Sequence, residues 1–312
     1  MTDYRALIDA ETWAFIDRTN SYYPPDTADG TIEQQRAVYD RMCRAFFAGY
    51  PEGVGVETKA ISAPGRDIPV RVYRASEDPP AVTLYFHGGG FVVGGLESHD
   101  DVCAELCART GHEIVSVDYR LAPEHVHPAQ FEDALAAFEW AAATYERPIL
   151  LAGDSAGGNL AAAVSHAVRD RLCRPVGQVL IYPGLGGDQS KGSYVTHAEA
   201  PMLSVRDLDF YRQARTGGRS LSGDPTLSPL ADADFSALPP TVIVTAECDP
   251  LSSDGEAYRD RILAAGGRAL WHEEKGLVHG YLRARHSVAR ARQSFTRIVE
   301  ALAALGRGEG VE

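Results

Sequence analysis

The residues best suited to chemistry lie in the segment Gly153-Asp154-Ser155-Ala156-Gly157. A short apolar run at 149–152 ends at this segment, and an alanine-rich helical pattern begins directly after it. A Gly-x-Ser-x-Gly motif between a strand and a helix is typical of a nucleophile elbow, which exposes the serine hydroxyl at the start of the helix. The same residues could also form a plain glycine-flanked turn, so Ser155 needs support from the rest of the chain.

A nucleophilic serine needs a base, and the base needs a group that orients it. His279 follows the last predicted strand, and Asp249 follows the strand before it, so the order Ser–Asp–His is that of α/β-hydrolases. Two other acids compete with Asp249. Asp254 is interpreted as a helix-start residue, and the side chain of Asp154 should point away from Ser155.

Three other histidines fit the role of general base less well than His279. His272 lies within a strand pattern and is interpreted as structural, whereas His125 and His127 lie beside prolines in a loop.

A second glycine-rich segment, His87-Gly88-Gly89-Gly90-Phe91, directly follows an apolar strand pattern. Successive glycines are entropically unfavourable unless the backbone itself must approach another group. An oxyanion hole makes that demand, because its N–H groups must reach a carbonyl oxygen as it gains charge. Gly89 and Gly90 are therefore candidates, together with Ala156 directly after the serine. A dinucleotide site is excluded, since Gly-x-Gly-x-x-Gly is missing.

The elements that would position these residues alternate between strand and helix, which indicates an α/β fold with a mostly parallel central sheet flanked by helices. An antiparallel strand is expected at 68–72. Further strands are predicted at 81–86, 114–117, 149–152, 179–182, 242–246 and 269–271. Helices are predicted around 131–138, at 255–265 and at 287–305.

Two segments interrupt this alternation and are predicted to form a helical cap. The first fifty residues contain two amphipathic helical patterns rich in aromatic residues, the second opening at Thr31-x-x-Gln34. The stretch between 182 and 241 is too long for a simple crossover, and Ser204 could cap a helix within it. The expected division is 1–50 and 184–222 for the cap, with 51–183 and 223–312 for the core.

Composition narrows the class of protein further. The formal net charge is −13, which disfavours nucleic acid or an anionic membrane as partner. No apolar run is long enough to span a membrane, and the first residues do not resemble a signal peptide. The five cysteines form no Cys-x-x-Cys pair, and Cys103 and Cys107 are expected to be buried thiols on a helix. These features predict a soluble, cytoplasmic protein.

The ordered motifs resemble the bacterial hormone-sensitive-lipase-like esterases, a family of α/β-hydrolases. The resemblance covers nearly the whole chain and implies Ser155 as nucleophile, His279 as base and Asp249 as orienting acid. It also implies oxyanion donors at Gly89, Gly90 and Ala156. The motifs that carry it are His87-Gly88-Gly89-Gly90-Phe91, Tyr119-Arg120-Leu121-Ala122-Pro123-Glu124, Gly153-Asp154-Ser155-Ala156-Gly157-Gly158-Asn159, Ser228-Pro229-Leu230, Leu238-Pro239-Pro240, Asp249-Pro250-Leu251 and His279-Gly280-Tyr281.

The chain departs from the family pattern in two places. His127 stands where the family usually has phenylalanine, and Ser252-Ser253-Asp254-Gly255 replaces arginine-aspartate-glutamate-glycine.

The expected activity is that of a cofactor-free, metal-free serine carboxylesterase acting on short- to medium-chain neutral esters. A small-molecule ester is the expected partner, and a homodimer is a possible assembly. An amidase or deacetylase could use the same three residues. A non-catalytic receptor is the other alternative, as in the gibberellin receptors, which resemble this family but lack the histidine that His279 supplies here.

Overall fold

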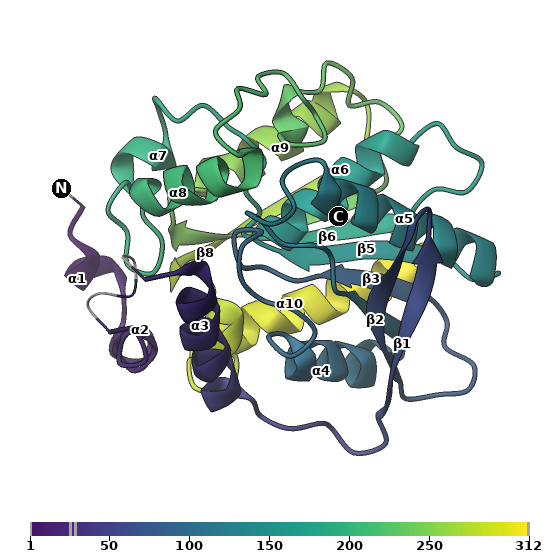
Figure 1. Cartoon of the computed structure of the whole chain (residues 1–312), viewed down its shortest axis with the longest axis horizontal. Coiled ribbons are helices and arrows are strands. Elements are labelled where there is room, and N and C mark those ends of the chain that lie inside the picture. Colours follow the sequence, from purple (N-terminus) through teal and green to yellow (C-terminus); the bar gives the residue numbers. More distant parts are fainter. Residues whose placement is uncertain (1, 25–26, 28–29, 311–312) are drawn as a thin grey trace.

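The computed structural model describes residues 2–24, 27 and 30–310 and is built around one eight-stranded sheet (Figure 1). The strand order is β1-β2-β4-β3-β5-β6-β7-β8. β3 to β8 are mutually parallel, while β2 pairs antiparallel with both β1 and β4. The predicted α/β-hydrolase architecture is therefore confirmed. The strands are β1 (Gly55–Ala63), β2 (Arg66–Arg74), β3 (Val82–Phe86), β4 (Glu113–Val117), β5 (Ile149–Asp154), β6 (Gly177–Ile181), β7 (Thr241–Cys248) and β8 (Ala269–Val278).

Helices cover both faces of the sheet because the central strands are apolar on both sides. β5 shows this directly: Leu150 and Ala152 belong to one hydrophobic cluster and Leu151 to the other. The first cluster is covered by α4 (Asp100–Thr110) and α10 (Ala289–Gly306), and the buried thiols of Cys103 and Cys107 lie within it. The second is covered by α5 (Ala129–Thr144), α6 (Ala156–Val168) and α9 (Ser252–Ala264) (Figure 1).

The remaining helices come from the two segments outside this alternation. The first contains α1 (Tyr4–Leu7), α2 (Ala10–Asn20) and α3 (Ile32–Phe46), and the second contains α7 (Ser193–Thr196) and α8 (Val205–Thr216). Both predicted capping signals are present, because Thr31 caps α3 and Ser204 caps α8 through reciprocal capping boxes. In Figure 1 the two groups lie together on the β8 side of the molecule. Positions 1, 25–26 and 28–29 of the predicted cap lie outside the described residues.

Two strands differ from the sequence prediction. β1 was not expected, because Ile61 is its one buried residue and its exposed edge position removes the apolar signal. β8 extends to Val278, seven residues beyond the predicted end at 271, and so reaches His279 directly. Its middle part carries charged residues, Glu273 to Lys275, which break the apolar pattern; Glu274 is buried and paired with Arg297, whereas Lys275 is exposed. Within the described residues, no helix is long and apolar enough to cross a membrane.

Candidate active site

The turn between β5 and α6 holds Ser155 in a conformation that few residues adopt. Its φ of 54° and ψ of −116° lie in a sparsely populated region for a residue with a Cβ atom. Close packing enforces this turn, because a Cβ added at Gly157 would lie 1.8 Å from the carbonyl oxygen of Phe86. The glycines of the motif therefore allow β3, β5 and α6 to meet behind Ser155, whose half-buried side chain lines the cavity.

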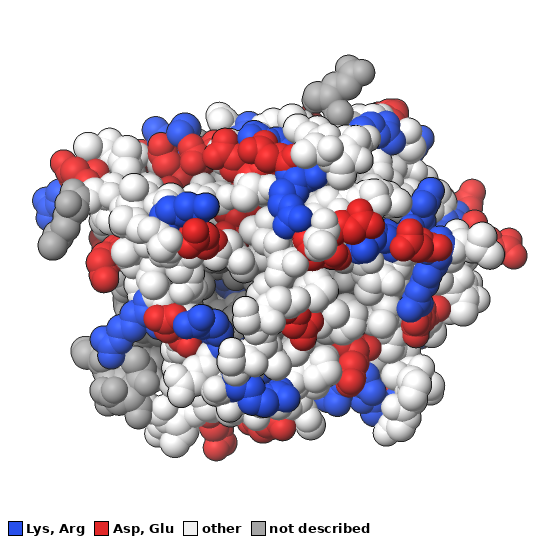
Figure 2. Space-filling view, turned by 90° about the horizontal axis from the view of Figure 1, so that it is seen from above, with Lys and Arg blue, Asp and Glu red and all other residues white. Residues whose placement is uncertain are grey.

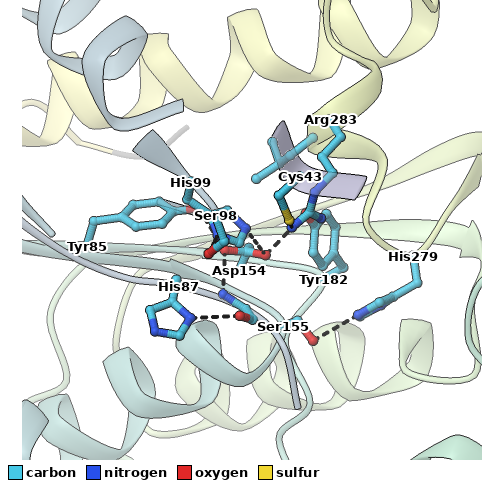
Figure 3. A network of polar contacts seen from close by, with 12 residues as sticks. Cys43, Tyr85, His87, Ser98, His99, Asp154, Ser155, Tyr182, His279 and Arg283 are labelled. Carbon is cyan, nitrogen blue, oxygen red and sulfur yellow. Dashed lines mark hydrogen bonds and ion pairs between the residues drawn. The ribbon is translucent and has the colours of Figure 1, made fainter. Parts of the chain in front are cut away.

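Ser155, His279 and Asp249 form one hydrogen-bonded chain. The Oγ of Ser155 lies 2.8 Å from Nε2 of His279, and Nδ1 of His279 lies 2.7 Å from Oδ2 of Asp249 (Figure 3 shows the first contact). The other carboxylate oxygen of Asp249, which is fully buried, accepts from the backbone N–H of Leu251 at 2.9 Å. A proton on Nδ1 would leave Nε2 free to accept the serine proton, which is the arrangement a general base requires.

Strand topology explains how residues far apart in sequence meet. Ser155, Asp249 and His279 directly follow β5, β7 and β8, three parallel strands of the same sheet. Residues that follow parallel strands emerge at the same edge, where open α/β sheets bind ligands.

The competing acid, Asp254, lies in the first turn of α9 as predicted, but its side chain has a structural function. Its Oδ2 accepts hydrogen bonds from the backbone N–H groups of Leu185 and Gly186 at 2.7 and 3.1 Å and from the Tyr194 hydroxyl at 3.0 Å. Burial raises the pKa of this carboxyl to about 6. Asp254 therefore holds the loop after β6.

The histidines set aside in the sequence analysis are all absent from this chain of contacts. His272 lies in β8, His125 is exposed, and His127 is buried with Nε2 3.1 Å from Oδ2 of Asp224. The His127 departure from the family pattern thus replaces a phenylalanine with a buried polar contact.

The glycine loop after β3 lies beside Ser155 and is held by Asp154. The backbone N–H of Gly88 donates to Oδ1 of Asp154 at 2.9 Å, and the Tyr85 hydroxyl donates to the same oxygen at 2.8 Å (Figure 3). Burial alone would raise the pKa of Asp154, but the His99 imidazole and the Tyr85 hydroxyl together bring that pKa below its ordinary range. The Asp154 side chain thus contacts the glycine loop, a role that sequence reasoning missed.

Gly89 and Gly90 have backbone conformations that side chains disfavour, with φ of 125° and 60°. Both line the same cavity as Ser155, Ala156 and His279. Ala156 is the first residue of α6, so its N–H has no acceptor within the helix. Three N–H groups near the serine are thus candidates for binding a developing oxyanion.

We expect alanine at Gly89 or Gly90 to lower kcat by about 10²- to 10³-fold, with a smaller rise in KM, because oxyanion contacts strengthen in the transition state. A Cβ at Gly89 would lie 2.2 Å from the carbonyl oxygen of Val93, and one at Gly90 would lie 2.3 Å from the Tyr211 ring. Gly65→Ala is the control, since Gly65 shares a positive φ but has no atom within 4 Å of the added Cβ. Steady-state kinetics and circular dichroism test this, and unchanged kcat in both loop variants would contradict it.

Ser155 opens into a cavity of about 430 Å³. Its walls combine the sheet edge with side chains of α2, α3 and α8, among them Thr19, Met42 and Leu208. Among the aromatic residues of the first fifty positions, Tyr23 lines the cavity, whereas Phe46 packs against Phe15 with ring centroids 5.5 Å apart. The space-filling view from above shows a hollow in the surface with basic and acidic side chains on its margin (Figure 2).

Many cavity residues were not found from the sequence, among them Tyr182, Arg215 and Arg283. Their positions in a strand end, a helix and a short turn carry no motif. Among the described residues, no group of three or more His, Cys, Asp or Glu side chains could hold a metal ion.

Comparison with known proteins identifies the family of the chain. Residues 83–283 match a family model described as alpha/beta hydrolase fold. The chain is 40% identical over 235 residues to esterase LipI of Mycobacterium tuberculosis, covering 72% of this chain and 73% of that protein. It is also 40% identical over 240 residues to carboxylesterase NlhH of Mycobacterium tuberculosis, covering 73% and 75%.

The structure superposes on a crystal structure of an esterase of Pyrobaculum calidifontis with a TM-score of 0.86 at 32% identity, covering 96% of this chain and 99% of that one. The resemblance inferred from the motifs is thereby confirmed. The chain belongs to the α/β-hydrolase fold family and, within it, to the hormone-sensitive-lipase-like esterases.

Proposed function

We propose that this protein is a serine carboxylesterase that hydrolyses short- to medium-chain carboxylic esters through an acyl-enzyme on Ser155. The observation that carries the proposal is the unbroken contact from Ser155 through His279 to buried Asp249 at a cavity of about 430 Å³. Membership in an esterase family and 40% identity to an esterase and a carboxylesterase support the same reaction class. No feature of the site favours amide over ester substrates.

In the proposed mechanism, the Ser155 oxygen attacks the ester carbonyl carbon while Nε2 of His279 removes the hydroxyl proton. Asp249 stabilises the resulting imidazolium, and the N–H groups of Gly89, Gly90 and Ala156 bind the oxyanion. His279 then donates the proton to the alkoxide, so the alcohol leaves and the acyl group remains on Ser155. Water, deprotonated by His279, adds to the acyl carbon, and His279 then returns this proton to the Ser155 oxygen as the carboxylic acid leaves.

We also propose that residues 1–50 and 184–222 form a cap that sets acyl-chain preference over the core of 51–183 and 223–312. Thr19, Met42 and Leu208 support this division, because each reaches the cavity from a segment outside the sheet and its covering helices. A panel of p-nitrophenyl esters from acetyl to dodecanoyl measures that preference.

A cytoplasmic location is proposed from the free thiols of all five cysteines. A homodimer would use a free edge of the sheet, at β1 or β8.

The proposed nucleophile can be tested without a known substrate by the organophosphate paraoxon. Attack of the Ser155 oxygen on phosphorus expels 4-nitrophenolate and needs the same base and oxyanion donors as acyl transfer. We expect mass spectrometry to find one diethylphosphoryl group per chain, on the peptide that contains Ser155. The His279→Ala variant should be labelled far more slowly. Labelling of another residue, or none on folded protein, would overturn the proposal.

A further inference from the structure

One wall of the cavity carries an arginine that the proposed reaction does not use. Arg283 lies in the 3₁₀ turn Tyr281–Ala284, four residues after His279, and lines the same cavity as Ser155. Its Nη2 donates to the Tyr39 hydroxyl at 2.6 Å and to Sγ of Cys43 at 3.2 Å, both on α3. Figure 3 shows Arg283 beside Cys43 and Tyr182, on the same side of the site as His279.

The charge of Arg283 has no direct counterpart in the part of the chain that the structure describes. It forms no ion pair there, and its buried Nε has no hydrogen-bond partner. Arg285, two residues further on, shows how a buried arginine is usually neutralised, because it forms ion pairs with both Asp101 and Glu105. Buried guanidinium groups stay protonated and normally bind a carboxylate or phosphate.

The nearest groups cannot neutralise it. Burial raises the pKa values of the Tyr39 hydroxyl and the Cys43 thiol, so both are uncharged at pH 7. The carboxylate of Asp154 influences Arg283 but is already bound by Gly88, Tyr85 and His99. Arg283 therefore lies near the charge of Asp154 without a direct ion pair to it, and its Nη1 has no hydrogen-bond partner among the described residues.

A second cavity arginine, Arg215, is engaged differently. Its guanidinium stacks 3.6 Å above the Phe91 ring, and its two Nη atoms donate to the Leu227 carbonyl and to Oδ1 of Asn159. These contacts connect α8 with the glycine loop and with α6, so Arg215 has a bracing role. Arg283 uses Nη2 alone in hydrogen bonds to protein groups among the described residues.

We propose that Arg283, flanked by Tyr23 and Tyr39, forms a subsite for a carboxylate carried by the ester substrate. This inference rests on the proposed esterase activity and names its preferred substrate class. It departs from the expectation of neutral esters, which followed from the acidic surface and the aromatic residues of the predicted cap. The cavity is lined by Arg212, Arg215 and Arg283 and by the acids Asp154 and Asp207. Arg212 is paired with Asp209 at 2.9 Å, so Arg215 and Arg283 supply the local positive charge.

Paired substrates test the subsite on either side of the scissile bond. For the acyl side, mono-4-nitrophenyl adipate is compared with its methyl-capped counterpart. Adipate is chosen because half-esters of shorter diacids cyclise through their own carboxylate. For the alcohol side, 4-carboxyphenyl butanoate is compared with 4-carbamoylphenyl butanoate. The subsite can lie on the acyl side or on the alcohol side, so one of the two pairs should report it. In that pair we expect the wild-type kcat/KM for the charged ester to equal or exceed that for the neutral ester.

Arg283→Gln should lower kcat/KM for the charged member of that pair by about 10- to 100-fold, mainly through KM. The neutral member should change by less than about threefold, which shows that the catalytic residues remain in place. Arg283→Lys should lie between, since lysine keeps the charge but not the planar fork. Arg206→Gln removes the same charge from an exposed position on α8 and should leave the ratio unchanged.

Equal losses on both members of each pair would make Arg283 a structural residue and overturn the subsite. Unchanged ratios in Arg283→Gln would overturn it as well, and so would a wild-type preference for the neutral member of both pairs. A wild-type protein that hydrolyses none of the four esters would instead refute the proposed esterase activity.

Discussion

Replacing Ser155 with alanine is expected to lower kcat for p-nitrophenyl butanoate by about 10⁴- to 10⁶-fold while the fold stays intact. The hydroxyl is the proposed nucleophile, and its loss leaves only the binding cavity and the oxyanion donors. Alanine is smaller than serine and can occupy the same turn, so neither the far-ultraviolet circular dichroism spectrum nor the cooperativity of thermal unfolding should change.

His279→Ala should cause a loss of the same size, because the serine attacks only when its proton is removed. The double variant should be no worse than either single variant, since groups that act as a unit have non-additive effects. His272→Ala is the control, because His272 lies on β8, the strand that His279 follows, but outside the chain of contacts. Additive losses in the double variant would show that Ser155 and His279 act independently and would contradict the proposed mechanism.

The second large effect is expected for Asp249→Asn, at about 10⁴-fold in kcat and less than the loss of the serine. Oδ2 of Asp249 lies 2.7 Å from Nδ1 of His279, and the charge of this carboxylate should stabilise the imidazolium formed during attack. Asparagine at position 249 keeps the packing but removes the charge. Its amide N–H₂ can also donate to Nδ1 of His279, which places the ring proton on Nε2, so that Nε2 cannot accept the serine proton. Stopped-flow or steady-state assays with p-nitrophenyl butanoate measure the loss.

Asp254→Asn provides the comparison, because Asp254 is equally buried and follows closely in sequence. Its carboxylate accepts hydrogen bonds from Leu185 and Gly186, so its replacement should change KM and stability more than kcat. Near-full activity of Asp249→Asn, with loss of kcat in Asp254→Asn, would reverse the assignment of the acid.

Most of the candidate site could be predicted because it lies immediately after strands. Ser155 and Asp249 each follow an apolar run, and His279 follows in the expected order Ser–Asp–His although β8 carries a charged stretch. Parallel strands deliver such residues to one edge whatever the length of chain between them. The conformation of Gly89 and Gly90 is likewise local, because it depends on the absence of a Cβ. Sequence motifs and hydrophobic periodicity are therefore sufficient to predict where these residues lie.

Arg283 and Tyr39 could not be predicted in the same way. Which side of a helix or short turn faces a cavity depends on how that element packs on others distant in sequence. Tyr39 lies on α3, and Arg283 lies more than two hundred residues later, yet they share a hydrogen bond. β1 was missed for a related reason, since an edge strand with one buried residue gains its structure from its partner β2 more than from its own pattern.

The side chain of Asp154 also determines which states of the protein are accessible. It directly precedes the serine in sequence and holds the glycine loop through the N–H of Gly88. If that loop moved away, a buried carboxylate would lose one of its donors, which is unfavourable in a low-dielectric interior. Folding of the central sheet should therefore also place the proposed oxyanion donors of the glycine loop. Heat or denaturant should abolish ester hydrolysis and tertiary structure together, with no folded but inactive species between them.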